Sequence, residues 1–205
     1  MRIEEIKPSQ RKRGRFLVKL EDGTILRLTE AEVAAFGLRA GLDLDSGRLA
    51  QLQADLRRSA ARAQAAGIAG SRALSRRELE EKLARRGVGQ ADVQAAADWL
   101  EDLGAINDGD YARLVARHYG DRGYGPGRVR EELRRRGVPK EFWEDALAQL
   151  PEAGASIDAY LQKKCRSAAP DAQERRRLAD GLLRRGFSWE DIRPALDRLG
   201  GDEEE

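Results

Sequence analysis

The sequence predicts a mainly α-helical protein of tandem three-helix repeats, which form an elongated, curved array beside a small N-terminal β-hairpin-plus-helix module. One segment occurs three times, as ELEEKLARRGV at 78–88, RVREELRRRGV at 128–138 and RLADGLLRRGF at 177–187. A fixed period of this length is typical of helical repeat arrays. The hairpin is predicted at 14–28, where GRFLVKL and TILRL flank an Asp-Gly turn, a pattern that favours a two-strand connection.

The three copies stay aligned beyond the shared segment. Each carries one glycine at the same place, and apolar residues recur at five further positions: Gly87, Gly137 and Gly186; Leu79, Val129 and Leu178; Leu83, Leu133 and Leu182; Val93, Trp143 and Ile192; Ala97, Leu147 and Leu196; Leu100, Leu150 and Leu199. Two helices per repeat therefore present an apolar face that one repeat cannot bury alone, and stacking of repeats buries it.

Local signals set the helix limits of the first repeat. Ser75 and Glu78 form a capping box that begins a helix, and Gly87 supplies the left-handed residue that ends it. We expect a second helix at about 91–103 and a third that begins near Asp108.

Prolines mark the second repeat. Pro126 stands at the first position of a helix, where proline is tolerated, and we expect Pro139 to begin the next helix in the same way. A third helix is predicted from about Ser156 to Cys165.

The third repeat begins near Asp171, ends its first helix at Gly186 and begins another at Ser188, with Asp191 in a capping-box-like arrangement. Pro194 lies six residues after that cap, so we expect it to kink the helix or to delay its start.

The N-terminal module combines the hairpin with a short helix that Thr29 and Glu32 cap and Gly37 ends. The expected domain limits are the N-terminal module at 1–45, a connecting helix at 46–71, repeats at 72–122 and 123–168, a partial third repeat at 169–200 and an acidic tail at 201–205.

Composition argues against an enzyme. The 205 residues include one histidine, His118, and one cysteine, Cys165, so an intramolecular disulfide is excluded and no cluster has metal-ligand spacing. A Cys-His pair is conceivable, but a half-buried cysteine and a surface histidine fit a packing array better. The N-terminus lacks the apolar core of a signal peptide and no run is long enough to span a membrane. We therefore expect a cytoplasmic protein without catalytic residues, cofactor or metal.

Arginine is unusually frequent, with 31 of the 38 basic residues, and it clusters before each repeat glycine. A GC-rich genome would explain the excess of arginine over lysine. Cations at a helix C-terminus also complement the helix dipole, although that explains one residue per helix better than two or three. A third interpretation is a basic stripe that binds phosphates or an acidic protein groove, partly neutralised by nearby glutamates.

The loop at 123–128, Gly-Tyr-Gly-Pro-Gly-Arg, resembles a phosphate-binding loop only superficially, since no strand precedes it. A turn that needs unusual backbone angles explains its glycines. That explanation leaves the Tyr124 ring among arginines, where it can stack on a partner surface or a base. The candidate partner-binding residues are Tyr124, Arg122, Arg128, Arg130, Arg134, Arg135, Arg85, Arg86, Arg184 and Arg185.

Four segments together resemble the bacterial RecX regulatory proteins over about residues 72–199: Ser75-Arg-Arg-Glu-Leu, Leu83-Ala-Arg-Arg-Gly87, Leu103-Gly-Ala-Ile-Asn-Asp108 and, most specifically, Gly123-Tyr-Gly-Pro-Gly-Arg-Val-Arg-Glu-Glu-Leu133. The resemblance implies tandem three-helix repeats and a negative modulator of the RecA recombinase, which lies along the groove of the RecA–DNA filament, suppresses ATP hydrolysis and strand exchange, and favours disassembly. It implies no catalytic residue and no cofactor.

Three positions depart from the expected pattern: Gly109 at a helix start, and Gly181 and Pro194 in the third repeat. The rival hypothesis is a protein that binds DNA directly, through the basic run Arg11-Lys12-Arg13 and the arginine stripe. The expected partners are thus the RecA filament and, indirectly or weakly, single-stranded DNA. Nothing in the sequence requires more than a monomer.

Overall fold

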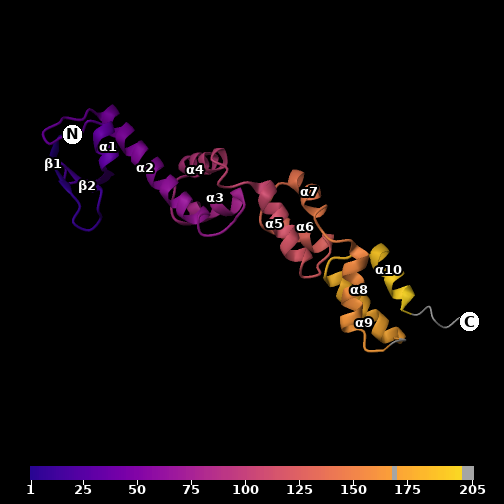
Figure 1. The fold of residues 1–205 in the computed structure, drawn as a ribbon. Coiled ribbons are helices and arrows are strands. Elements are labelled where there is room, and N and C mark those ends of the chain that lie inside the picture. Colours follow the sequence, from indigo (N-terminus) through magenta and orange to yellow (C-terminus); the bar gives the residue numbers. More distant parts are fainter. Residues whose placement is uncertain (168–169, 200–205) are drawn as a thin grey trace, which may run out of the picture. The chain divides into compact units, whose positions relative to one another are not determined.

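The computed structural model describes residues 1–167 and 170–199 (Figure 1). Contacts divide the chain into two compact units: Met1–Gln64 with Gly89–Ala96, and Ala65–Val88 with the chain from Ala97 onward. The predicted acidic tail at 201–205 lies outside the described residues.

The first unit contains a three-stranded antiparallel sheet in the order β1 (Ile3–Pro8), β2 (Arg15–Leu20) and β3 (Ile25–Thr29). The predicted hairpin is confirmed as β2 and β3. Strand β1 was not expected, because IEEIKP is mostly charged or polar and its pairing partner, not its own composition, holds it in the sheet.

One face of this sheet is buried. Ile3, Val18 and Leu28 are fully buried and form a cluster with Leu44 and Leu52. The short helix α1 (Glu30–Ala35) begins at the predicted capping box of Thr29 and Glu32, and the long helix α2 (Ser46–Ala69) contributes Leu52 to this core. The other face of the sheet is directed away from this core.

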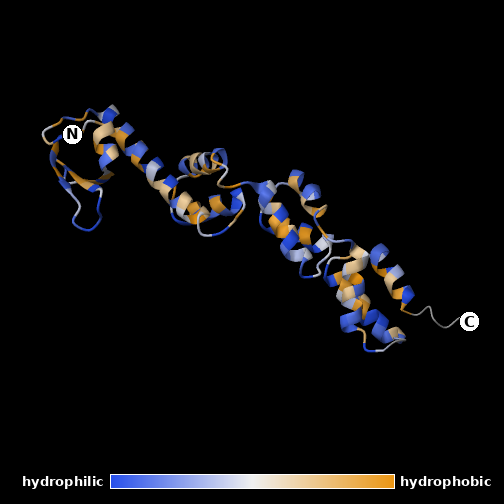
Figure 2. Ribbon diagram, viewed as in Figure 1, coloured by the Kyte–Doolittle hydropathy of each residue, from blue (hydrophilic) through white to orange (hydrophobic). Residues whose placement is uncertain are grey.

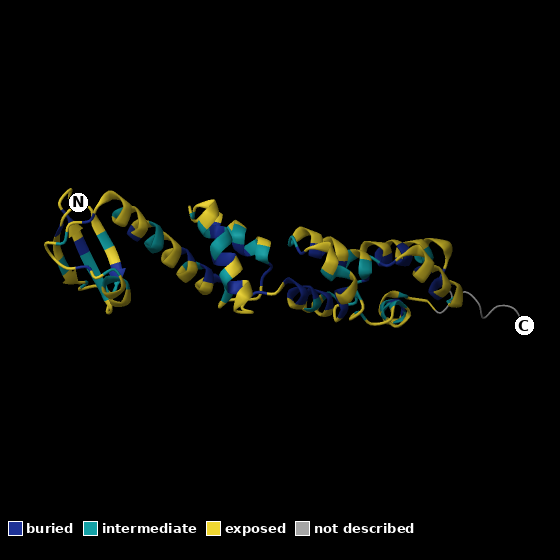
Figure 3. Ribbon diagram, turned by 90° about the horizontal axis from the view of Figure 1, so that it is seen from above, coloured by how far each residue is buried: buried dark blue, intermediate teal, exposed yellow. Residues whose placement is uncertain are grey.

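The remaining helices run from α3 to α10, and the first part of α4 belongs to the first unit. Their limits are α3 Arg76–Arg85, α4 Gln90–Asp102, α5 Asp108–Gly120, α6 Pro126–Arg135, the 3-10 helix η1 Lys140–Phe142, α7 Trp143–Leu147, α8 Ala153–Lys164, α9 Ala172–Arg184 and α10 Trp189–Arg198. Hydrophobic and hydrophilic residues alternate along these helices (Figure 2), and Figure 3 shows buried positions on them and in the sheet. The mainly helical fold and the N-terminal β module are thereby confirmed.

The predicted helix limits agree closely with the structure. Ser75 and Glu78 form the capping box of α3, and Pro126 occupies the first turn of α6. The repeat glycines that follow α3, α6 and α9 have φ angles of 79°, 70° and 87°, the left-handed conformation that favours glycine at this position.

The prediction for Pro139 needs correction, as does the delayed helix start that was one alternative for Pro194, whereas the other alternative, a kink, stays a prediction. Pro139 has an extended backbone, with ψ at 143°, and precedes η1 instead of standing inside a helix. The expected single helix is divided into η1 and α7, and the indole nitrogen of Trp143 donates to the Val138 carbonyl at 3.0 Å. Pro194 lies inside α10, which begins without delay at Trp189, because the Ser188 cap and the buried Ile192 hold the first turns in place.

Two hydrophobic clusters each combine three helices. One joins residues of α5, α6 and α7, including Val115, Val129 and Ala146, and the other joins α8, α9 and α10, including Ile157, Leu178 and Ile192. Helices α5 and α8 stand third in the repeats predicted from the sequence. Each of them packs with the two helices that follow it in the chain. The domain limits expected above stay a prediction.

Neighbouring aromatic rings explain the two unusual glycines. A Cβ at Gly109 would lie 3.2 Å from the Phe142 ring, and one at Gly181 would overlap the Tyr160 hydroxyl. Both glycines are buried inside helices. They therefore make room for an aromatic side chain.

Candidate partner-binding surfaces

The repeats meet through the caps of their helices. The Ser75 hydroxyl, at the start of α3, donates to the backbone carbonyl of Arg136, at the end of α6, at 2.5 Å. One repeat further on, the Gly125 amide, at the start of α6, donates to the carbonyl of Arg185, at the end of α9, at 2.8 Å. The same relationship thus occurs at both junctions, with a side-chain donor in one and a backbone donor in the other.

The glycine after each of these caps allows a close approach. A Cβ at Gly186 would overlap the Arg128 amide and lie 2.8 Å from the Arg128 Cβ, and a Cβ at Gly137 would lie 2.9 Å from the Arg77 Cβ. The corresponding Gly87 has no atom within 4 Å of such a Cβ. Gly137 and Gly186 therefore serve both the helix end and the junction, whereas Gly87 serves the helix end alone.

An arginine lies over a tyrosine ring in two successive repeats. The Arg136 guanidinium lies 5.8 Å from the centre of the Tyr111 ring, and that of Arg185 lies 5.1 Å from the Tyr160 ring. Tyr111 also donates to Glu78 at 2.8 Å and accepts from Arg136 at 2.5 Å. Burial and this bond to Glu78 raise the pKa of Tyr111, so its hydroxyl stays a donor at neutral pH.

Tyr124 belongs to the second junction. Arg185 lies 5.1 Å from its ring centre and also donates to the carbonyls of Arg122 and Gly123, both at 2.9 Å. The ring of Tyr119 meets that of Tyr124 edge-on, with centres 5.5 Å apart. Tyr124 and Arg185 therefore bind each other and the neighbouring backbone. Only the exposed edge of the half-buried Tyr124 ring is accessible to a partner.

Glu132 is the centre of a buried charge cluster. Its side chain is only 4% exposed, yet it accepts hydrogen bonds from Arg128 at 3.0 Å and Arg135 at 2.6 Å, and Arg136 forms an ion pair with it at 3.6 Å. Burial opposes ionisation of Glu132, but the Arg135 hydrogen bonds and the surrounding positive charge outweigh it and hold the pKa of this carboxyl below its usual value.

Apart from Arg185, which is held at the second junction, the predicted arginines fall into two groups. Arg128, Arg130 and Arg135 form intramolecular ion pairs, although the Arg135 side chain remains 65% exposed. Within residues 1–167 and 170–199, five others are exposed and have no carboxylate within 4 Å: Arg85, Arg86, Arg122, Arg134 and Arg184. We call these five the free arginines. No carboxylate among the described residues neutralises their charge.

The sequence analysis missed an apolar surface on the third repeat. Trp189 is 53% exposed and Leu183 is 46% exposed, and both line a groove of about 500 Å³ between α9 and α10. The repeat alignment contains a signal for it, because Trp189 aligns with Lys140 and Leu183 with Arg134. An exposed tryptophan where another repeat has lysine is typical of a binding anchor.

The two residues considered for catalysis lie in ordinary surroundings. Cys165 is half-buried and its Sγ lies 3.1 Å from the Ser167 carbonyl oxygen. His118 is exposed and meets the Tyr119 ring edge-on. In the part of the chain that the structure describes, no helix combines the length and the apolar character needed to cross a bilayer.

These features define a helical-repeat protein whose surfaces suit a macromolecular partner. Family models named "RecX, second three-helix domain" and "RecX, third three-helix domain" match residues 107–147 and 155–196. The regulatory protein RecX of Halorhodospira halophila is 33% identical over 63% of this chain and 82% of its own length, and that of Xanthomonas axonopodis pv. citri is 37% identical over 64% and 82%. The chain belongs to the RecX family of regulatory proteins, which are not enzymes.

The comparisons also extend to the N-terminal module. RecX of Bacillus cytotoxicus is 28% identical over 96% of this chain and 76% of its own length. A crystal structure of a regulatory protein RecX has the same fold, with a TM-score of 0.76 and 22% identity over 96% of this chain and 98% of that one. The structure of RecX from Lactobacillus salivarius matches 70% of this chain and 96% of that one, with a TM-score of 0.65 and 22% identity.

Proposed function

We propose that this protein regulates the RecA recombinase by binding in the groove of the RecA–DNA filament, where it inhibits ATP hydrolysis, strand exchange and filament growth. The observation that carries the proposal is membership of the RecX family over the three-helix repeats. A partner that is a protein filament also suits a chain whose charged and apolar surface features lie on successive repeats.

The free arginines support an electrostatic part of this binding. Arg85, Arg134 and Arg184 lie in the last turns of the first helices of the three repeats, so an extended partner meets positive charge on each repeat. Because none of the carboxylates that the structure describes has to be displaced, these side chains bind an acidic surface without first losing an ion pair to them.

The α9–α10 groove supplies an apolar anchor. Trp189 and Leu183 are already exposed, and Arg175 and Arg193 beside them are paired with Asp197 at 3.4 Å and 3.6 Å. Tryptophan is among the side chains enriched at energetically dominant interface positions. We therefore expect Trp189→Ala to weaken filament binding about tenfold or more while leaving the fold intact.

The test is single-stranded-DNA-dependent ATP hydrolysis by RecA, with this protein titrated in at substoichiometric amounts. We expect inhibition well below one protein per recombinase. The triple charge reversal of Arg85, Arg134 and Arg184 to Glu should abolish most of it. A matched control changes Arg39, Arg117 and Arg166 to Glu, since these arginines are exposed but lie away from the ends of those helices, and it should inhibit normally.

Equal effects of the two triple variants would mean that net charge alone determines inhibition, which contradicts the proposed surface. The rival hypothesis, direct DNA binding through the arginines, predicts that inhibition tracks affinity for naked DNA and falls steeply with salt. Inhibition that disappears when the single-stranded DNA is supplied in excess over both proteins would therefore favour competition for DNA over regulation of the filament.

A further inference from the structure

We propose that the open face of the N-terminal sheet binds the phosphate backbone of a nucleic acid. A groove of about 690 Å³ lies on this face. The side chains that carry the argument are five cations and one leucine, which we call the basic groove: Lys7, Arg11, Lys12, Arg15, Leu17 and Arg27.

Strand pairing places three of these residues in one row. Leu17 on β2 pairs with Lys7 on β1 and with Arg27 on β3, and side chains of directly paired residues lie on the same face of a sheet. Arg15, two residues before Leu17, lies on this face too. The next row, Ile6, Val18 and Leu26, belongs to the core on the opposite face. Core burial therefore fixes the orientation of the cationic row.

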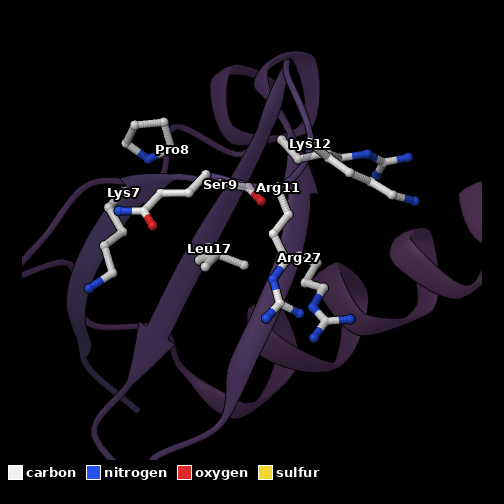
Figure 4. A pocket seen from close by; sticks show the side chains of 9 residues that line it. Lys7, Pro8, Ser9, Arg11, Lys12, Leu17 and Arg27 are labelled. Atoms are coloured by element: carbon white, nitrogen blue, oxygen red, sulfur yellow. The ribbon is translucent and has the colours of Figure 1, made fainter.

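The loop between β1 and β2 completes the groove. Figure 4 shows Lys7 on one side of Leu17 and the side chains of Arg11 and Arg27 close together on the other. Lys12, from the same loop as Arg11, lies at the rim (Figure 4). Positive charge thus comes from three strands and one loop, and it converges on a concave surface with an aliphatic floor.

The charge in this groove is largely uncompensated. Lys7 pairs with Glu5 at 2.9 Å. Arg11, Lys12, Arg15 and Arg27 have no carboxylate within 4 Å among the residues that the structure describes. The groove lining itself contains no acidic residue.

Some arginines of the helices are bound by several carboxylates at once. Arg76 is bound by Glu80, Asp98 and Glu101, and Arg113 by Asp110 and Asp145. Unpaired arginines also occur on the helices, as the free arginines show, but in the basic groove four unpaired cations converge on one concave face. A ligand that carries a regular series of negative charges supplies the missing counter-charge.

The chemistry of the groove favours a phosphate backbone over a base-specific contact. Leu17 is the only large apolar side chain in the lining, and the lining has no aromatic ring on which a base could stack. Arginine forks bind phosphate oxygens bidentately, and lysine binds them as a point charge. We therefore expect binding that depends little on sequence and strongly on salt.

DNA binding by the basic groove is independent of the proposed regulation of RecA, because it takes place in the absence of RecA. Fluorescence anisotropy of labelled oligothymidylate, and of its duplex with oligoadenylate, would measure affinity for the full chain across a salt series. For single strands, four phosphate contacts correspond to a slope of about −3 in log affinity against log salt.

The triple variant Arg11→Glu, Lys12→Glu and Arg27→Glu should lose affinity about tenfold or more and flatten the slope by about 2. The triple variant of Arg39, Arg117 and Arg166 described above has the same change in net charge and should keep both the affinity and the slope. Equal losses in the two triples would overturn the proposal, since binding would then follow net charge alone.

A variant that is expected to bind DNA more tightly distinguishes a lost contact from misfolding, because a misfolded protein would not gain affinity. Leu17→Arg adds a cation at the centre of the groove, and it should tighten DNA binding severalfold and steepen the salt slope by about 0.7. Unchanged or weaker binding would count against the groove. Stronger binding of the unchanged protein to polyglutamate, or to vesicles of equal parts phosphatidylserine and phosphatidylcholine, would assign the groove to another anion and overturn the proposal.

Discussion

The Ser75 hydroxyl and the Arg136 carbonyl are 61 positions apart in the sequence and are joined by a hydrogen bond of 2.5 Å. The same hydroxyl accepts from the Glu78 amide at 3.1 Å as the N-cap of α3. One hydroxyl group therefore satisfies a backbone amide at the start of α3 in the first repeat and also bonds to the second repeat. Because Ser75 is fully buried, water cannot replace either bond.

Ser75→Ala should accordingly cost more than a simple cap deletion. We expect a loss of about 1 kcal/mol for the cap and about 1 kcal/mol more for the junction, measured as the free energy of unfolding in urea. Ser188→Ala is the matched control, because Ser188 caps α10 in the same way but bonds only to Asp191. Equal losses for the two variants would show that the buried junction bond contributes no more than the exposed bond from the Ser188 hydroxyl to the Asp191 carboxylate.

The junction glycines allow a second comparison. Gly87→Ala should cost about 1–2 kcal/mol, the penalty of a left-handed backbone for an L residue. Gly186→Ala has that same penalty, and its new methyl group would also collide with the Arg128 backbone, which should add about 1–3 kcal/mol. Urea unfolding of both variants measures the difference. A Gly186→Ala protein no less stable than Gly87→Ala would mean that the repeats separate at little cost.

Variants of Tyr124 distinguish a role in packing of the junction from a role in binding a partner. Removal of the ring in Tyr124→Ala eliminates its contact with Arg185, worth about 0.5–1 kcal/mol, and we expect inhibition of RecA ATP hydrolysis to fall more than this loss of stability explains. Tyr124→Phe keeps the ring and should leave both unchanged. If inhibition instead falls only in proportion to the unfolded fraction, the role of Tyr124 is confined to the junction.

The sequence predicted the elements whose signals are local. The capping boxes at Thr29 and Ser75 and the glycine helix ends need only a few neighbouring residues, and they were found where expected. Strand β1 and the division of the helix after Pro139 depend on partners distant in the chain, such as β2 for the Ile3–Pro8 segment. These two features therefore could not be predicted from local patterns.

The candidate site was harder to predict for a related reason. Arg134, Arg135 and Arg136 are adjacent and chemically identical, yet Arg134 is free, Arg135 binds Glu132, and Arg136 both pairs with Glu132 and lies over the Tyr111 ring. Helix geometry turns consecutive side chains by about 100°, so which arginine meets a carboxylate depends on the packing of neighbouring helices. Repeat alignment alone treats these positions as one basic cluster.

Glu132 makes the stability of the protein sensitive to acid. Its folded-state pKa is lowered from an ordinary value of 4.5, so its stabilising contribution is complete above the unfolded-state pKa and is lost as pH falls through the folded-state value. Glu132→Gln removes this ionisation. We expect the variant to be less stable at neutral pH by about 1.5–3 kcal/mol, the range for a hydrogen bond to a charged group, and we expect that difference to shrink progressively below pH 4.5.

The neighbouring Glu131 provides the control for this prediction. It pairs with Arg128 at 2.6 Å but is 53% exposed, so Glu131→Gln should change stability by no more than about 1 kcal/mol. Chemical unfolding of the three proteins across the acid range distinguishes the two sites. If Glu132→Gln and the unchanged protein lose stability in parallel as the pH falls, then the buried cluster holds its arginines by packing and not by charge.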